Sequence, residues 1–276
     1  EEKVFNNDTQ KIEVKKSTVL IFPRYHQLDV IRKLKNKVQS DGVGNSYLIQ
    51  HTTGSGKSFE IGWLSHLLTS LYQSDADTRR MFDTIIVITD RKVLDKALQN
   101  LIKSLEQTSG VVNVIDKDSQ QLKKYLESGK DIIITTIQKF PFITNAISSL
   151  GDKKFAVIID EVHSSQTGER SKYLKKALSK HDLLGGDYED YLNAEIGSRG
   201  QQSHISFFGF TGTPKNKTLE LFGTKGDDNK FHAFDTYSMH QSIHEGFTLD
   251  VLQNYTTYIR YFKVKEKSGQ DIEVPA

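Results

Sequence analysis

Cysteine is absent from this chain of 276 residues. Its absence excludes disulfide bonds, thiolate catalysis, and zinc or iron–sulfur clusters that are held by cysteine. The formal net charge is only +2, from 37 basic and 35 acidic residues, so any basic strip that contacts a nucleic acid must be local. The longest apolar runs, such as Thr84–Thr89, have the length of a strand and fall far short of the roughly 20 residues of a membrane span.

The beginning of the chain is highly charged and has no signal-peptide pattern. Together with the absence of cysteine, this predicts a cytoplasmic protein that does not contact a membrane. The first residue is Glu1 rather than Met. We therefore expect the sequence to be a fragment of a longer polypeptide.

Short apolar runs alternate along the chain with segments of helical periodicity. The runs that predict strands are residues 47–50, 84–89, 111–115, 132–135, 155–159 and 205–210. Runs rich in β-branched residues are typical of strands that are covered on both faces. The alternation predicts an α/β fold: a doubly wound, mostly parallel sheet flanked by helices. In such a sheet, ligands bind beyond the carboxyl ends of the strands.

Composition divides the chain into three parts. Residues 1–18 are polar, and we expect a linker or the edge of an upstream domain there. Residues 19–246 form one lobe in this interpretation, and residues 247–276 begin a second lobe or a connector. Within the lobe, residues 180–203 look like a polar excursion and residues 215–230 like a loop.

The strongest motif is residues 51–58, His-Thr-Thr-Gly-Ser-Gly-Lys-Ser, between a predicted strand and a predicted helix. This is the context of a phosphate-binding loop of the form G-x-x-x-x-G-K-[ST]. In such a loop Lys57 contacts phosphate oxygens and Ser58 binds Mg²⁺. His51 departs from the pattern, which has glycine there, and helicase-like ATPases relax this position. The residues expected to bind ATP in the loop are Thr53, Gly54, Ser55, Gly56, Lys57 and Ser58.

Three further residues complete the predicted ATPase site. Asp160 and Glu161 end an apolar strand, where Asp160 can hold Mg²⁺ and Glu161 can act as the general base for water. Gln27 lies upstream of the loop and can offer a donor and an acceptor to the edge of adenine. On its own, Gln27 fits a solvated helix start equally well. The predicted catalytic residues are Lys57, Asp160 and Glu161.

Together these motifs resemble the first motor lobe of superfamily 2 helicases and translocases, a RecA-like P-loop NTPase. Four stretches resemble more closely the motor (R) subunit of type I restriction enzymes. They are residues 22–30 (FPRYHQLDV), 136–142 (TIQKFPF), 160–166 (DEVHSSQ) and 209–214 (GFTGTP).

This resemblance implies an ATP- and Mg²⁺-dependent translocase of double-stranded DNA that works with methylation and specificity subunits. It also implies a nuclease domain and a second motor lobe, whose motifs the sequence lacks. We therefore expect the chain alone to bind ATP, hydrolyse it weakly and leave DNA uncleaved. The residues expected to contact DNA or to couple it to the nucleotide are Thr89, Arg91, Thr135, Thr136, His163, Thr211 and Thr213.

Other interpretations remain open. Residues 224–227 (TKGD) fit a guanine-reading motif of GTPases, but no hydrophobic strand precedes them. Another superfamily 2 helicase or a remodeller, acting on RNA or DNA, would share the ATP chemistry. A catalytically silent lobe used for DNA binding or assembly is a third alternative, although Lys57, Ser58, Asp160 and Glu161 are all present.

Overall fold

The computed structural model describes most of the predicted lobe. The described residues are 2–6, 11–15, 21–74, 76–89, 92–115, 119–136, 139, 143, 146–147, 150–151, 153–160 and 203–250, with the backbone alone at 2–6, 11–15, 92–95 and 119. Residues 137–147, whose sequence predicts a helix, therefore lie largely outside the described residues, as do the excursion at 180–203 and the chain after residue 250.

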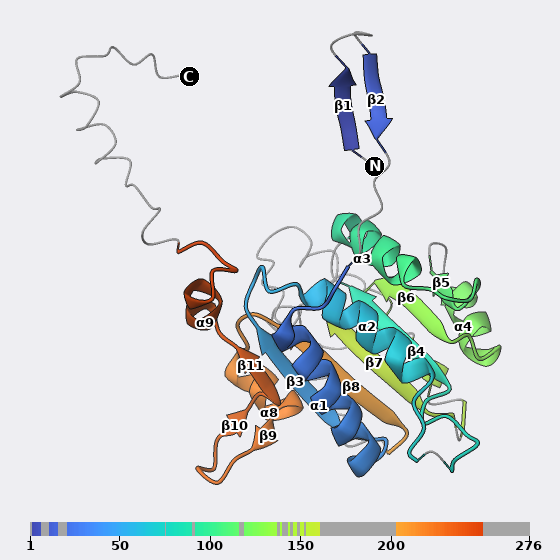
Figure 1. Ribbon diagram of the computed structural model, residues 1–276. Coiled ribbons are helices and arrows are strands. Elements are labelled where there is room, and N and C mark those ends of the chain that lie inside the picture. Colours follow the sequence, from blue (N-terminus) through green and yellow to red (C-terminus); the bar gives the residue numbers. More distant parts are fainter. Residues whose placement is uncertain are drawn as a thin grey trace, which may run out of the picture.

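A seven-stranded sheet forms the centre of the fold (Figure 1). Its order is β11-β3-β8-β7-β4-β6-β5, and every neighbouring pair is parallel. The strands are β3 (Ser46–His51), β4 (Thr84–Thr89), β5 (Val112–Val114), β6 (Ile132–Thr136), β7 (Phe155–Asp160), β8 (Ile205–Thr211) and β11 (Asp235–Tyr237). This confirms the predicted doubly wound parallel sheet.

Helices cover both faces of the sheet. On one face, α1 (Tyr25–Asp41), α2 (Lys57–Thr69) and α3 (Lys92–Ser104) contribute to an apolar core. A second core on the opposite face includes α4 (Ser119–Glu127) and α8 (Asn216–Phe222). The two cores take alternate residues of the same strand, because successive side chains of a strand point to opposite faces.

The middle strands are built from residues that suit burial on both sides. All six residues of β4 are buried, and five of the six residues of β7 are buried. Their sequences, TIIVIT and FAVIID, consist mainly of the β-branched residues that pack well in a covered sheet. The sheet is therefore a closely packed central layer, and the predicted motifs lie at the carboxyl ends of its strands.

Residues 1–18, the expected linker or edge of an upstream domain, contain two antiparallel strands, β1 (Glu2–Asn6) and β2 (Lys11–Lys15), which among the described residues pair with each other. One expectation drawn from composition was wrong. The expected loop at 215–230 begins with helix α8, because Phe222 and Thr218 are fully buried there and compensate for its polar composition.

The segment after α8 also contains structure. Strands β9 (Thr224–Lys225) and β10 (Phe231–His232) form a small antiparallel pair, so the TKGD sequence lies outside the main sheet. Strand β11 then adds to the edge of the main sheet beside β3, and helix α9 (Met239–His244) follows it. No helix among the described residues is long and apolar enough to cross a membrane.

The buried sheet makes a stability prediction. Phe208, on β8, is fully buried, whereas Phe22 is 79% exposed. Phe208→Ala should lower the free energy of unfolding by about 3–5 kcal/mol, because it removes a large side chain and leaves a cavity. Urea unfolding would measure this, with Phe22→Ala as the matched control that changes stability by less than about 0.5 kcal/mol. Equal effects of the two substitutions would contradict the assigned core.

Candidate functional site

The phosphate-binding loop joins the end of β3 to the start of α2. Gly54 and Gly56 have φ angles of +84° and +90°, which side chains of L-residues rarely adopt. Gly56 is the residue before α2, and no side chain caps the helix there. Unsatisfied N–H groups and the positive end of the helix dipole make such a helix start suited to an anion.

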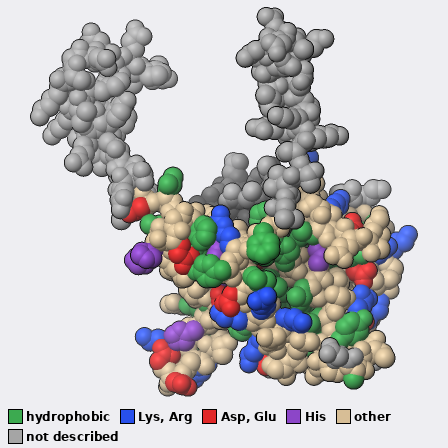
Figure 2. Space-filling view, viewed as in Figure 1, with side chains coloured by type: hydrophobic (Ala, Val, Ile, Leu, Met, Phe, Trp, Pro, Cys, Tyr) green, Lys and Arg blue, Asp and Glu red, His purple; other side chains and the backbone are tan. Residues whose placement is uncertain are grey.

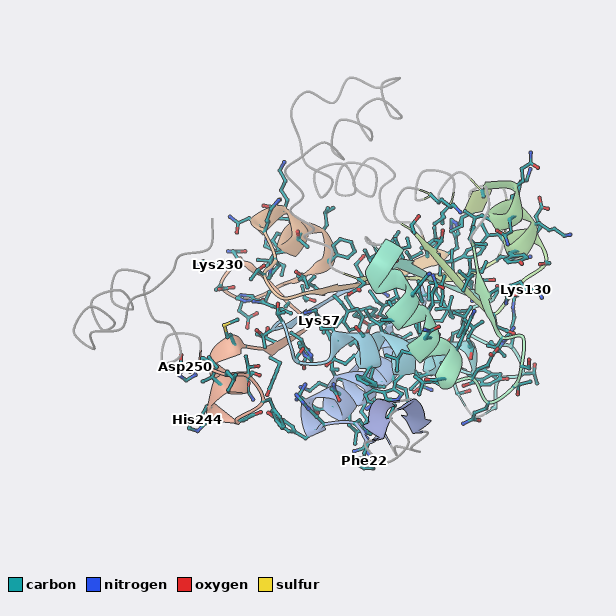
Figure 3. The ribbon with its side chains drawn as sticks, turned by 90° about the horizontal axis from the view of Figure 1, so that it is seen from above. Phe22, Lys57, Lys130, Lys230, His244 and Asp250 are labelled. Carbon is teal, nitrogen blue, oxygen red and sulfur yellow. The ribbon has the colours of Figure 1, made fainter. Side chains whose placement is uncertain are left out.

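Lys57 is the first residue of α2, and its side chain folds back over the loop. Its Nζ donates to the carbonyl oxygens of His51 and Thr52, at 3.2 and 3.4 Å, and the residue is only 8% exposed. Figure 3 places Lys57 in the middle of the molecule, at a distance from the labelled Lys130. Ser58, by contrast, is exposed. The loop therefore offers a cation and a hydroxyl beside the helix start, a donor set that fits a Mg²⁺-bound phosphate group.

Asp160 and Thr211 reach the same edge of the sheet as the loop. Strand β8 lies between β3 and β7, and the register pairs Asp160 with Phe210 and Thr211 with Gln50. Strands two positions apart in a sheet are separated by about 10 Å. The loop and the carboxylate expected to hold Mg²⁺ therefore emerge at neighbouring points of one edge.

The sequence matches the SWI2/SNF2 ATPase family over residues 26–186, which is more than half of the chain. The chain belongs to the SWI2/SNF2 ATPase family. The match begins at the start of α1 and includes the phosphate-binding loop and β7, so this lobe contains the family's ATPase domain.

The chain is similar in sequence to individual type I restriction enzyme subunits, in agreement with the resemblance of its motifs. Type I restriction enzyme endonuclease subunits of Staphylococcus aureus strains COL and MRSA252 are each 27% identical to the chain over 266 residues. The match covers 92% of this chain and 24% of theirs, so the chain spans about a quarter of these relatives. The predicted resemblance to type I restriction subunits is thereby confirmed.

The similar solved structures include that of a nuclease-deletion mutant of the Type ISP restriction-modification enzyme LlaGI in complex with a DNA substrate mimic. The sequence identity is 14% and the TM-score is 0.49, over 90% of this chain and 23% of that chain.

Gln27 supports the phosphate-binding loop of this ATPase. Its Nε2 donates to the carbonyl of Ser55 at 2.9 Å, and its Oε1 accepts from the backbone N–H of Arg24 at 2.8 Å. The neighbouring His26 contacts the same Ser55 carbonyl at 3.1 Å through its Nε2. Gln27 is 4% exposed, so the structure brings it to the loop, and its contact with adenine stays a prediction.

The other predicted residues differ in their exposure. Thr89 and Thr135, near the ends of β4 and β6, are buried, and their hydroxyls have no hydrogen-bond partner among the described residues. Thr136 is half-buried and Thr213 is exposed. Glu161, His163 and Arg91 lie outside the described residues. The expected contacts of all these residues with DNA or water remain predictions.

Motif residues from β8 also touch the loop. A Cβ atom added to Gly212 would lie 3.4 Å from the Oγ1 of Thr53, so glycine permits this close approach. Thr211 is fully buried, and its Oγ1 accepts from the backbone N–H of Thr213 at 3.3 Å. A shift of the loop would therefore change its contact with Gly212 and displace residues 211–213.

The segment 235–250 was not recognised in the sequence as part of the site. The carbonyl of Tyr237, on β11, accepts from the backbone N–H of Thr52 at 2.9 Å, and the Tyr237 ring stacks on His26 at 3.9 Å. Burial raises the pKa of Tyr237 to about 12, so its hydroxyl stays protonated and donates to Glu245 at 2.6 Å. Strand β11 itself offers only Tyr237 as an apolar residue in the sequence Asp-Thr-Tyr, which is a weak signal of this packing.

Exposed hydrophobic side chains lie near the start of α1. The face of the molecule that carries α1 and α2 shows several of them (Figure 2). The guanidinium of Arg24 lies 4.3 Å from the centre of the Phe247 ring, and Phe247 is 39% exposed. This cation–π contact ties the end of segment 235–250 to the residues beside Gln27.

Gly56 gives a test of the loop geometry. A Cβ atom there would lie 2.3 Å from the Nε2 of Gln27, whereas Gly110, with a similar φ of +95°, has nothing within 4 Å. Gly110→Ala should cost about 1–2 kcal/mol of stability through backbone strain alone. Gly56→Ala should cost about 1 kcal/mol more, because the displaced Gln27 amide loses its bond to Ser55.

Urea unfolding of both alanine variants measures this difference. In the background of Gly56→Ala, the further change Gln27→Ala should cost about 1 kcal/mol less than it costs in the wild type, since the bond to Ser55 is already broken. If Gly56→Ala is no more destabilising than Gly110→Ala, Gln27 does not support the loop.

Proposed function

We propose that this chain is the ATP-binding motor lobe of a type I restriction endonuclease subunit that translocates double-stranded DNA. The observation that carries the proposal is the convergence of Lys57, Ser58 and Asp160 at one edge of a parallel sheet. Such a constellation provides the charge and the metal ligands that phosphoryl transfer requires. The similarity to the staphylococcal endonuclease subunits supports the restriction context.

Each residue has a distinct role in this proposal. The backbone of residues 53–56 and the Lys57 ammonium bind the phosphates of ATP, while Ser58 and Asp160 hold Mg²⁺. The metal neutralises charge on the phosphates when it is bound. Glu161 takes a proton from the water that attacks the terminal phosphate. Gln27 contacts adenine from the side of α1.

DNA is proposed to lie across the carboxyl edge of the sheet. The contacts there come from Thr89, Arg91, Thr135, Thr136 and His163, while Thr211 and Thr213 couple DNA to the nucleotide. Contacts of this kind to phosphates position a duplex and carry no sequence information. Recognition of the DNA site is assigned in this proposal to the specificity subunit, in a complex that also contains the methylation subunit.

Removal of the loop cation tests nucleotide binding. Lys57→Ala should weaken the affinity for Mg-ATP at least a hundredfold, because the phosphates lose their strongest charge partner. Calorimetric titration with Mg-ATP and Mg-GTP measures it. Lys130→Ala is the matched control, since Lys130 precedes β6 at the opposite edge of the sheet. Unchanged ATP affinity in Lys57→Ala would refute the assigned site.

Replacement of the proposed base separates binding from chemistry. Glu161→Gln should keep Mg-ATP affinity while hydrolysis falls by about 10²–10⁴, the usual range for a positioned base. The assay measures ATP hydrolysis stimulated by duplex DNA. It uses a polypeptide that contains this chain and has the full length of the related endonuclease subunits. Glu127→Gln, on the exposed end of α4, is the control with unchanged turnover. Normal turnover in Glu161→Gln, or stimulation by RNA in place of duplex DNA, would count against the proposal.

A further inference from the structure

His51 occupies the first position of the phosphate-binding loop, where the general motif has glycine. Its side chain is fully buried between α2 and β11. The Nδ1 atom lies 2.9 Å from Oε1 of Glu60, and the Nε2 atom lies 2.9 Å from Oδ1 of Asp235. These two carboxylates come from different elements, so the ring joins the helix that follows the loop to the strand beside it.

The partners of His51 determine its protonation state. An ionised carboxylate only accepts hydrogen bonds, so both ring nitrogens must donate, and only an imidazolium carries a proton on each. Burial lowers the pKa of His51, but the bonds to Asp235 and Glu60 outweigh burial, and the net pKa is raised. Burial alone would raise the pKa of Asp235, yet its bonds to His51 and Lys33 make that pKa lower than usual.

Charges of alternating sign continue outward from this group. Lys33, on α1, lies 2.7 Å from Oδ2 of Asp235 and 2.6 Å from Oδ2 of Asp29. The ring centres of His26, on α1, and Tyr237, on β11, lie 5.8 and 5.9 Å from that of His51. Glu60 and Asp235 contact the ring nitrogens of His51, and Lys57 contacts its backbone carbonyl, whereas Lys33 and Asp29 lie beyond Asp235. Glu60 is fully buried, and its Oε2 has no partner among the described residues.

We propose that His51, as an imidazolium, is a positioning residue for the phosphate-binding loop and thereby sets the affinity for Mg-ATP. Glu60 lies in the first turn of α2, together with Lys57 and Ser58. The bond from His51 to Glu60 therefore holds that turn, and the bond to Asp235 anchors it to β11. This inference rests on the proposed function, because it concerns the same ATP site.

Loss of the proton has a defined consequence. A neutral ring can donate from one nitrogen only, so it leaves either Glu60 or Asp235 without its donor. Because the pKa of His51 is raised on folding, its contribution is complete below the unfolded value of about 6.5 and is lost as pH rises through the folded value. Burial lowers the pKa of His26, so His26 titrates below this window and stays neutral within it.

Nuclear magnetic resonance with ¹⁵N-labelled histidine tests the charge directly. At pH 7, both ring nitrogens of His51 should give the signals of protonated nitrogen, and His51→Gln identifies these signals by their loss. An unprotonated ring nitrogen at His51 at pH 7 overturns the inference.

Titration with Mg-ATP between pH 6.5 and 9 tests the positioning role. His51→Gln should bind about tenfold to a hundredfold more weakly at pH 6.5. The ratio of its dissociation constant to that of the wild type cancels the titration of the nucleotide, and this ratio should fall as pH rises. His232→Gln is the matched control, because His232 also contacts a carboxylate, Asp228 at 2.9 Å, but is exposed on β10. That variant should retain the wild-type profile.

A second variant separates positioning from folding. The double variant His51→Gln/Glu60→Gln replaces the buried carboxylate with a neutral amide, so the melting temperature of this variant should recover towards that of the wild type. Its binding of Mg-ATP should stay weak, and it should lack the part of the pH dependence that the wild type owes to His51. Wild-type affinity and pH profile in His51→Gln overturn this inference alone. Failure of the wild type to bind Mg-ATP at any pH overturns the proposed function and this inference with it.

Discussion

The parallel pairing of β3, β8 and β7 is the constraint on which the site depends. Strands that run in one direction bring their carboxyl ends to one edge, and β8 pairs with both neighbours. Asp160 and Thr211 therefore emerge at the same edge as the loop that follows β3, although they lie far from it in the sequence. Apolar side chains on both faces hold this register, because a shifted strand would lose its packing on two sides.

The loop itself is fixed from several directions. His26 and Gln27 from α1 contact the Ser55 carbonyl, and the Thr52 amide donates to β11. Gly212 packs against Thr53 from the end of β8. Glycine adopts positive φ angles readily, so the glycines alone leave several loop conformations open, and these contacts select one of them. The shape of the phosphate site is thus a property of three elements together with the glycine-rich sequence.

Much of this arrangement follows from local sequence. Strands such as β4 and β7 are continuous β-branched runs, and the loop motif falls between a strand and a helix. Strand β11 escaped prediction because it has three residues and only one of them is buried. Its position beside β3 depends on contacts between residues far apart in the sequence, such as His51 and Asp235, which are 184 residues apart. No local pattern encodes such a pair, and the partners of Gln27 were hidden for the same reason.

The histidine in the loop has to be understood together with its partners. A buried carboxylate is costly to leave alone, and removal of one member of a buried ionic group destabilises more than the group contributes. Glycine at position 51 would leave Glu60 and the inner oxygen of Asp235 without their donor. Conversely, an imidazolium without both carboxylates would be an isolated buried charge. The three residues therefore form one unit, and the relaxed first position of this loop is possible because β11 lies beside it.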